Sequence, residues 1–280
     1  PVPSMDALAL RWFDHYVKGK PDPGLASDIA PVTYYEIGSD KWRTAPSWPG
    51  PDAHARSWYL AGKSNPGSPG ELHQATPTTD GGDAIYPVPV TGLCTRSTSQ
   101  WTAGLVSGTP CDHNNALNDL AGTSYQTAPM AEPVRLLGPI NAELYVSTTA
   151  HDGMISAHVE DVAPDGTVTR LTGGWQVLSL RANDRSASMV RDGQILRPWH
   201  PFTKASQLPV EPGKVMKVEV EVFPTGAVVK PGHRLRVTLQ AFDTPHLLPT
   251  LPQLVDSLGG IITVHHSSRY PSRITLPVRG

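Results

Sequence analysis

The chain has 280 residues, a formal net charge of -2 and a pI of about 6.6. This balance, without any run of Lys or Arg, argues against nucleic acid and anionic membranes as partners. No apolar stretch approaches the roughly 18 to 20 residues of a membrane span, and no signal peptide opens the chain, although a removed leader would leave no trace.

The first predicted element is a helix that Ser4 can cap and that Gly19 and Pro21 end. Its apolar residues recur at steps of three and four, so they form one wide stripe along the helix. Such a stripe needs a large apolar partner, whereas the rest of the chain reads as strands and turns. The residues of the stripe are Met5, Leu8, Ala9, Trp12, Phe13 and Tyr16.

From residue 32 onward the apolar pattern changes to a period of two, which is typical of strands. In one segment Val218, Val220 and Val222 form a dry face, and charged residues alternate with them. Many short strands without helices between them predict an all-β fold of two packed sheets, most simply a jelly roll. The predicted strands cover 32–37, 57–62, 140–146, 155–162, 175–180, 214–223, 233–241, 261–264 and 273–278.

The stretch from about 65 to 127 is rich in Gly, Pro, Thr and Asn, and its weak periodicity predicts an irregular insert. Cys94 and Cys111 both lie in it. A disulfide between them would close a loop of roughly 15 residues and contribute about 3 kcal/mol to stability. Such a bond persists in an oxidising compartment, which favours a secreted or cell-envelope protein. The alternative is a pair of buried, reduced thiols.

Catalytic motifs are absent from the sequence. It contains no G-x-S-x-G nucleophile elbow, no H-E-x-x-H, no phosphate-binding loop and no dinucleotide fingerprint. Ser64 and Ser124 each lie two residues after a glycine but lack the second glycine, so they are interpreted as plain loop serines. No catalytic residue and no cofactor is therefore predicted in this chain.

Metal binding is also not predicted. Two lone thiols cannot form a structural zinc site, and the neighbours His265 and His266 would point to opposite faces of a strand. His158 and Glu160 share one strand face, which permits a metal ion but does not require one, and a solvated or hydrogen-bonded strand face is the favoured interpretation. The acidic segment 161–166 lacks the ligand spacing of a calcium loop and is interpreted as a hairpin turn.

Three tryptophans, Trp101, Trp175 and Trp199, raise the alternatives of a stacking platform for sugar rings and of ordinary core packing. Trp101 differs from the others because it lies between the cysteines, where no pattern calls for a buried ring. With Leu105 and Val106 close behind it, this loop is the candidate substrate-binding segment, and plugging of the sandwich end by Trp101 is the alternative.

Eight segments in a fixed order carry a family resemblance over nearly the whole chain. They are LRWFDHYVKGK, PVTYYEIGSDKWR, SWYL, LLGPINAELYVST, HVEDVAPDG, LTGGWQVLSLR, PGKVMKVEVEVFPTGAVVKPGHRLRVTLQAFDTP and HHSSRYPSRITLPV. None of them is a catalytic motif. Their collinear order resembles the carboxy-terminal part of the X-Pro dipeptidyl-peptidase and cocaine-esterase family of α/β serine hydrolases.

This resemblance implies two parts. Residues 1–20 would be the last helix of an otherwise absent α/β-hydrolase domain, and residues 21–280 would be a jelly-roll (galactose-binding-like) β-sandwich. The family's catalytic Ser, Asp and His would lie upstream of Pro1, so the chain is expected to lack the triad and to be inactive alone.

The resemblance also implies a role. The chain is expected to be the accessory domain of a serine hydrolase that cleaves acyl ester or X-Pro peptide bonds. It would stabilise the hydrolase domain and wall its pocket, with Trp101, Leu105 and Val106 near the substrate. Its partners would be that hydrolase domain and, through it, a small ester or peptide. The alternative is a free-standing jelly-roll module that binds carbohydrate or a protein.

Overall fold

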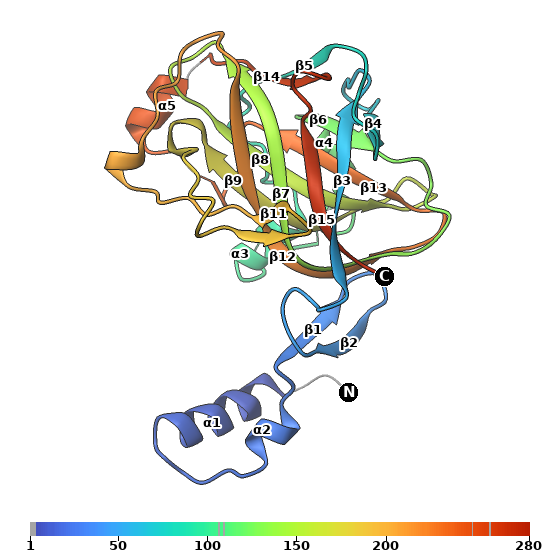
Figure 1. Ribbon diagram of the computed structural model, residues 1–280, viewed down its shortest axis with the longest axis vertical. Coiled ribbons are helices and arrows are strands. Elements are labelled where there is room, and N and C mark those ends of the chain that lie inside the picture. Colours follow the sequence, from blue (N-terminus) through green and yellow to red (C-terminus); the bar gives the residue numbers. More distant parts are fainter. Residues whose placement is uncertain (1–3, 106, 109, 248, 258) are drawn as a thin grey trace.

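A helical module begins the chain in the computed structural model, which describes residues 4–105, 107, 108, 110–247, 249–257 and 259–280. Helices α1 (Met5–Tyr16) and α2 (Leu25–Asp28) lie apart from the large sheet in Figure 1. As predicted, the Ser4 side chain caps α1 by accepting a hydrogen bond from Ala7 N. Arg11 of α1 forms ion pairs with Asp22, in the connection between the two helices, at 2.8 Å and with Asp28 of α2 at 3.2 Å. No helix among the described residues is long and apolar enough to cross a bilayer.

Strands dominate the remainder, and two hairpins flank the main sheet. Strands β1 (Val32–Glu36) and β2 (Lys41–Ala45) link the helical module to the sandwich, and β10 (Met189–Arg191) pairs with β11 (Gln194–Arg197). The main sheet contains β3 (Ala53–Ala61), β4 (Gly70–His73), β5 (Gly81–Ile85), β6 (Thr123–Gln126), β7 (Val134–Thr148), β8 (Met154–Val162), β9 (Val168–Val177), β12 (Met216–Val229), β13 (Arg234–Gln240), β14 (Ile262–His266) and β15 (Arg273–Arg279).

The main sheet closes on itself. Its strand order is β12-β9-β8-β13-β6-β4-β3-β15-β7-β14-β5, and β12 also pairs along β7 from Met216↔Val146 to Val229↔Val134. Neighbouring strands run antiparallel apart from β4 and β6, which are parallel. The result is a β-sandwich with barrel-like closure, which confirms the mostly-β prediction. Short helices lie in its connections, namely α3 (Arg96–Trp101), α4 (Ala116–Asp119), α5 (Leu251–Ser257), η1 (Pro110–Asp112), η2 (Leu178–Leu180) and η3 (Lys204–Ser206).

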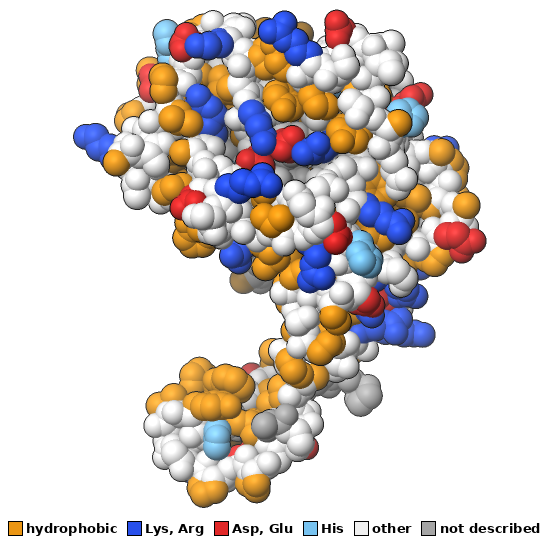
Figure 2. All heavy atoms as spheres, viewed as in Figure 1, with side chains coloured by type: hydrophobic (Ala, Val, Ile, Leu, Met, Phe, Trp, Pro, Cys, Tyr) orange, Lys and Arg blue, Asp and Glu red, His pale blue; other side chains and the backbone are white. Residues whose placement is uncertain are grey.

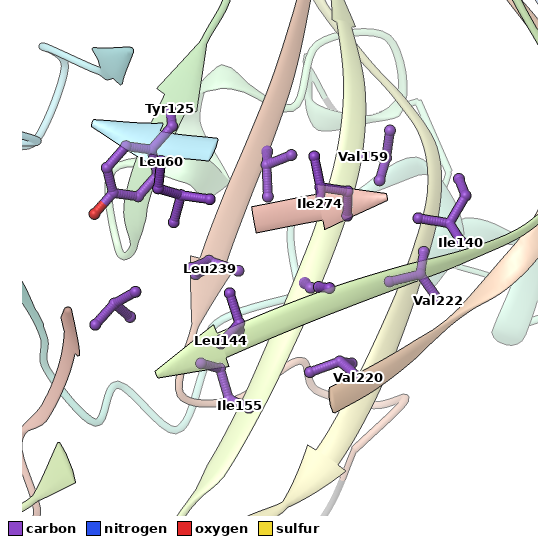
Figure 3. Close-up of a cluster of buried hydrophobic side chains, with 14 of the residues drawn as sticks. Leu60, Tyr125, Ile140, Leu144, Ile155, Val159, Val220, Val222, Leu239 and Ile274 are labelled. Atoms are coloured by element: carbon purple, nitrogen blue, oxygen red, sulfur yellow. The ribbon is translucent and has the colours of Figure 1, made fainter. Parts of the chain in front are cut away.

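The core lies between the two walls of this closed sheet, and Figure 3 shows side chains from β7, β8, β12, β13 and β15 converging there. Val218, Val220 and Val222 are fully buried, as their alternation predicts. The opposite face of β12 is drier than expected. Glu219 is also buried, and its carboxylate accepts hydrogen bonds from Asn141 and from a neighbouring asparagine side chain.

The predicted irregular insert contains more order than its composition indicates. Strands β4, β5 and β6 and helices α3 and α4 all lie between residues 65 and 127. Strands β4 and β5 escape detection because they are four and five residues long and begin with glycine, where a strand would usually have a β-branched or aromatic residue. A Cβ at Gly81 would collide with the His266 ring, and one at Gly70 with the Tyr125 ring, so packing excludes larger residues there.

Candidate functional site: a pocket beside helix α3

The three predicted substrate-binding residues occupy different settings. Trp101 ends α3 and is 63% exposed, so it does not plug the sandwich. Leu105 is 91% exposed and does not line the pocket described below. Val106 lies outside the described residues.

A pocket of about 420 Å³ lies between α3, β9 and the turn of the β1–β2 hairpin. This volume falls within the range of about 300 to 1,000 Å³ that is usual for small-molecule sites. Four aromatic side chains wall it, and arginine, serine and glutamine side chains add polar groups. These lining residues are Tyr35, Trp101, Trp175, Phe223, Arg96, Arg170, Ser97 and Gln100.

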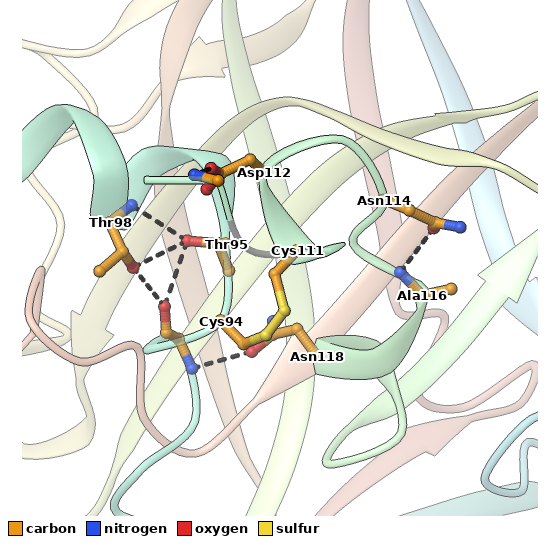
Figure 4. The surroundings of a disulfide bond; sticks show 10 residues. Cys94, Thr95, Thr98, Cys111, Asp112, Asn114, Ala116 and Asn118 are labelled. Atoms are coloured by element: carbon orange, nitrogen blue, oxygen red, sulfur yellow. Dashed lines mark hydrogen bonds between the residues drawn. A yellow bond between two sulfur atoms is a disulfide. The ribbon is translucent and has the colours of Figure 1, made fainter. Parts of the chain in front are cut away.

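A disulfide and several threonine hydrogen bonds hold helix α3 in place, as Figure 4 shows. The structure joins Cys94 to Cys111 in a disulfide with Cα atoms 5.1 Å apart. Thr95 caps the helix by accepting a hydrogen bond from Thr98 N at 3.2 Å. Both threonine hydroxyls donate to Gly92 O, at 3.1 Å and 2.6 Å. These contacts fix the side of the pocket that carries Ser97 and Trp101.

Asp243 is the charged centre beneath the pocket floor, and its side chain is fully buried. Its Oδ2 accepts hydrogen bonds from Arg170 Nη2 at 2.8 Å, from Trp175 Nε1 at 2.8 Å and from His158 Nε2 at 3.2 Å. Burial alone would raise the pKa of this carboxyl, but His158, His246 and Arg170 together hold the pKa well below its usual range. The group is therefore a carboxylate that satisfies several donors at once.

His246 connects Asp243 to the pocket surface. It lies in the turn after β13, where Leu247 N donates to Asp243 O at 2.8 Å. Its ring stacks on Trp175 at 5.6 Å between centroids and meets Trp101 edge-on at 5.1 Å. Its Nε2 lies 2.6 Å from Ser97 Oγ, and its Nδ1 lies 3.3 Å from Asp243 Oδ1. A serine, a histidine and an aspartate thus stand in line.

This alignment was not predicted from the sequence. Ser97 and His246 are 149 residues apart, so no local motif joins them. The available signal was the segment AFDTPH, which places Asp243 and His246 three residues apart directly after a predicted strand. Nothing in that segment indicates which serine it faces.

The other residues considered from sequence have structural partners. His158 and Glu160 are buried on one face of β8, where Glu160 accepts hydrogen bonds from Asn115 and Thr238. Ser124 lies in β6, not in a loop as expected, and its N–H donates to Ser64 Oγ at 2.9 Å. Among the described residues no cluster of three or more His, Cys, Asp or Glu is arranged to hold a metal ion.

The histidine pair and the tryptophans separate as well. His265 contacts Ser147 Oγ at 2.8 Å, whereas His266 contacts the buried Asp83 at 3.1 Å, so the two rings use opposite faces of β14 as predicted. Trp101 and Trp175 share the pocket, but Trp199 does not line it. The three tryptophans therefore form no common platform.

Comparison with known proteins matches residues 25–275 to the family described as the X-Pro dipeptidyl-peptidase C-terminal non-catalytic domain. A Mycobacterium bovis protein named as a serine esterase is 30% identical to this chain over 279 residues. The match covers 98% of this chain and 41% of that protein. Cocaine esterase of a Rhodococcus species is 24% identical over 99% of this chain and 46% of the esterase.

The fold comparison agrees. A CocE/NonD family hydrolase from Staphylococcus aureus superposes with a TM-score of 0.68 at 18% identity, over 99% of this chain and 46% of that one. The chain thus spans less than half the length of these relatives. It belongs to the family of X-Pro dipeptidyl-peptidase C-terminal non-catalytic domains.

Proposed function

We propose that this chain is the accessory domain of a serine hydrolase that cleaves acyl ester or X-Pro peptide bonds. In this role α1 is a helix of the hydrolase domain, residues 21–280 are a jelly-roll sandwich, and the sandwich stabilises its neighbour while walling the substrate pocket. The proposal is supported by the relatives, which include an esterase and a protein named as an X-Pro dipeptidyl-peptidase and are more than twice as long as the matched part.

The exposed apolar face of α1 is the observation that carries the proposal. None of the helix residues is buried, and Trp12, Phe13 and Tyr16 are 49%, 58% and 59% exposed. Figure 2 shows hydrophobic side chains gathered on this module, below the sandwich. A contiguous apolar patch of this kind marks an interaction surface. A free-standing carbohydrate-binding module gives the patch no role, whereas an adjoining hydrolase domain would cover it.

The test uses the full-length hydrolase with Trp12→Ser and Phe13→Ser combined. If α1 packs on the hydrolase domain, the melting temperature of that domain and kcat/KM should both fall, because the buried apolar area is lost. Trp199→Ser combined with Phe202→Ser is the matched control, since these aromatic residues are exposed on the sandwich. A full-length variant that melts and turns over like the control would overturn the proposal.

The wall of the substrate pocket has its own test. Trp101 is exposed beside a pocket and sits on a helix anchored by a disulfide, so it is a rigid aromatic surface for a ligand. In the full-length hydrolase, Trp101→Ala should lower kcat/KM unevenly across acyl groups of different size and leave the melting temperature nearly unchanged. A uniform loss of kcat/KM that follows stability would assign Trp101 a packing role only.

The same disulfide supports a location. Cystine bonds persist in oxidising compartments, so we place the protein outside the cell or in the cell envelope. Fractionation of the source cells, followed by detection of the chain with an antibody, tests this placement. Recovery in the reducing cytosol with free thiols would contradict it.

A further inference from the structure

The pocket beside α3 carries more exposed aromatic surface than core packing explains. Tyr35, Trp101 and Phe223 all line it, and they are 44%, 63% and 53% exposed. They come from three separate elements, namely β1, α3 and β12. Exposed aromatic side chains that gather around one concavity mark a binding site for a ligand with an apolar surface.

Polar side chains at the same pocket are free to bind a ligand. Neither Arg96 nor Asp40 forms an ion pair among the described residues, and the Gln100 side chain has no hydrogen-bond partner there. Asp40 accepts one hydrogen bond, from the Tyr35 hydroxyl at 3.2 Å. Desolvation and Asp40 raise the pKa of Tyr35, and the Arg96 charge opposes the rise, so both charged groups lie near this phenol. The pocket thus presents hydrogen-bond donors and acceptors together.

The aromatic walls are fixed in position before a ligand arrives. The contact of 2.6 Å between Ser97 Oγ and His246 Nε2 ties α3 to the turn after β13. The His246 ring lies against both Trp101 and Trp175, and the buried Asp243 accepts a hydrogen bond from Trp175 Nε1 at 2.8 Å. The line of serine, histidine and aspartate therefore holds two walls of the pocket. A site arranged in advance loses less conformational entropy when it binds.

A sugar ring has the chemistry that matches this combination. The C–H bonds on the face of a pyranose carry slightly positive hydrogens, which suit the electron-rich face of an aromatic ring. Each sugar hydroxyl both donates and accepts hydrogen bonds, so it can use a guanidinium, a carboxylate or an amide. An aromatic acid would bring its carboxylate close to Asp40, and an apolar acyl chain would leave Arg96, Asp40 and Gln100 without partners. The lining therefore favours a neutral, hydroxyl-rich ligand.

We propose that the pocket beside α3 binds a pyranose sugar, with Trp101 stacked on the sugar ring and Arg96, Asp40 and Gln100 hydrogen-bonded to its hydroxyls. The stacking surface differs from the one considered from the sequence, because Trp199 does not line this pocket. Binding is a property of the 280-residue chain itself, so it goes beyond the accessory role in a hydrolase. It involves no bond making and agrees with the description of the family as non-catalytic.

The experiment titrates the 280-residue chain with methyl β-D-glucopyranoside and with methyl β-D-galactopyranoside in a calorimeter. At least one glycoside should bind with a dissociation constant on the order of 1 mM, the strength expected for a ligand of this size. D-Glucitol is the matched control ligand, because it carries similar hydroxyls on an open chain without a ring face. It should bind much more weakly. Sodium benzoate represents the aromatic-acid alternative and should also bind more weakly than the glycoside.

Variants locate the binding site. Trp101→Ala should weaken glycoside binding by roughly tenfold, because the stacking surface is lost. Asp40→Asn removes the carboxylate charge and should also weaken binding, while asparagine tolerates the φ of 55° at this position. Trp199→Ala is the matched control, since it removes an exposed ring outside the pocket and should bind like the unaltered chain.

Four results would overturn the proposal. They are the absence of binding by both glycosides up to about 50 mM, equal binding of D-glucitol, tighter binding of benzoate than of either glycoside, and unchanged affinity in Trp101→Ala. None of these results bears on the accessory role, because the pocket-wall test of Trp101 is read from ester hydrolysis by the full-length hydrolase.

Discussion

Asp119 is a buried carboxyl whose proton affinity shapes stability against pH. Asn115 Nδ2 donates to both Asp119 and Glu160, and Arg236 Nη1 contacts Asp119 at 3.0 Å. Burial and the nearby Glu160 charge raise the pKa of Asp119 to about 9, against the opposing pull of Arg236. Because the folded-state pKa exceeds the ordinary value of 3.8, the folded protein binds this proton more tightly than the unfolded chain does.

The stabilisation from this proton is therefore complete below about pH 4 and is lost as pH rises toward about 9. Asp119→Asn cannot ionise, so its free energy of unfolding should fall less between pH 5 and pH 8 than that of the unaltered chain. Urea unfolding at both pH values measures the difference. Glu211→Gln, at an exposed carboxylate, should keep the original pH dependence. An unchanged slope in Asp119→Asn would contradict the assignment.

Asp243 illustrates the cost of removing one partner from a buried charged cluster. Arg170 is 8% exposed in its side chain, so Asp243→Asn would leave its guanidinium buried without a matching charge. The free energy of unfolding should fall by about 3 to 5 kcal/mol. Combining Asp243→Asn with Arg170→Met should recover part of this loss, and urea unfolding of the four proteins completes the cycle. Strictly additive losses would show that the two side chains do not interact.

At the scale of elements, the disulfide restrains the loop that carries α3. Cys94 and Cys111 are 17 residues apart, and the chain-entropy estimate for a loop of this size is about 3 kcal/mol. Cys94→Ser combined with Cys111→Ser should lower the free energy of unfolding by about that amount and open residues between them to protease. Non-reducing mass spectrometry checks the bond itself. Two free thiols in freshly purified protein would contradict the bond.

How far sequence predicts the elements depends on where each strand finds its partner. In β12 and β13 the alternation of apolar and polar residues correctly predicts which face is buried, and Val218 and Leu235 on that face are both fully buried. Strands β4 and β5 show no such alternation. Aromatic rings from strands distant in the sequence pack against Gly70 and Gly81 and leave no room for a side chain there. Helix α3 was also not predicted, because it is only six residues long and lies in a loop that the disulfide closes. Local pattern therefore predicts elements that pack on one face, and it misses those defined by long-range contacts.

The same limit applies to the candidate site. Trp101 was singled out because it lies between the cysteines, where no pattern calls for a buried ring, and in the structure its side chain is exposed and lines the pocket. Ser97, His246 and Asp243 were not, because their alignment depends on the closure of the sheet and on the packing of α3 against the turn after β13. Side chains that meet across 149 residues leave no periodic trace in sequence.

At the scale of the whole molecule, the helical module and the sandwich touch little. Figure 1 shows α1 and α2 connected to the large sheet through the β1–β2 hairpin, and no residue of α1 is buried. The module is held together by Arg11 and its two carboxylate partners, with Leu25 enclosed inside it. Ion pairs that are open to solvent contribute little to stability, because water and salt screen the charges. The stability of the sandwich should therefore be independent of α1.

Deletion of residues 1–20 tests this independence directly. The truncated chain should melt within about 4 °C of the full chain, since a change of 1 kcal/mol shifts the melting temperature of a domain of this size by roughly 2 to 4 °C. It should also be more soluble, because Trp12, Phe13 and Tyr16 no longer meet water. Differential scanning calorimetry and light scattering measure the two effects. A drop of ten degrees or more would mean instead that α1 folds back onto the sandwich in solution, and its apolar face would then need no second domain to cover it.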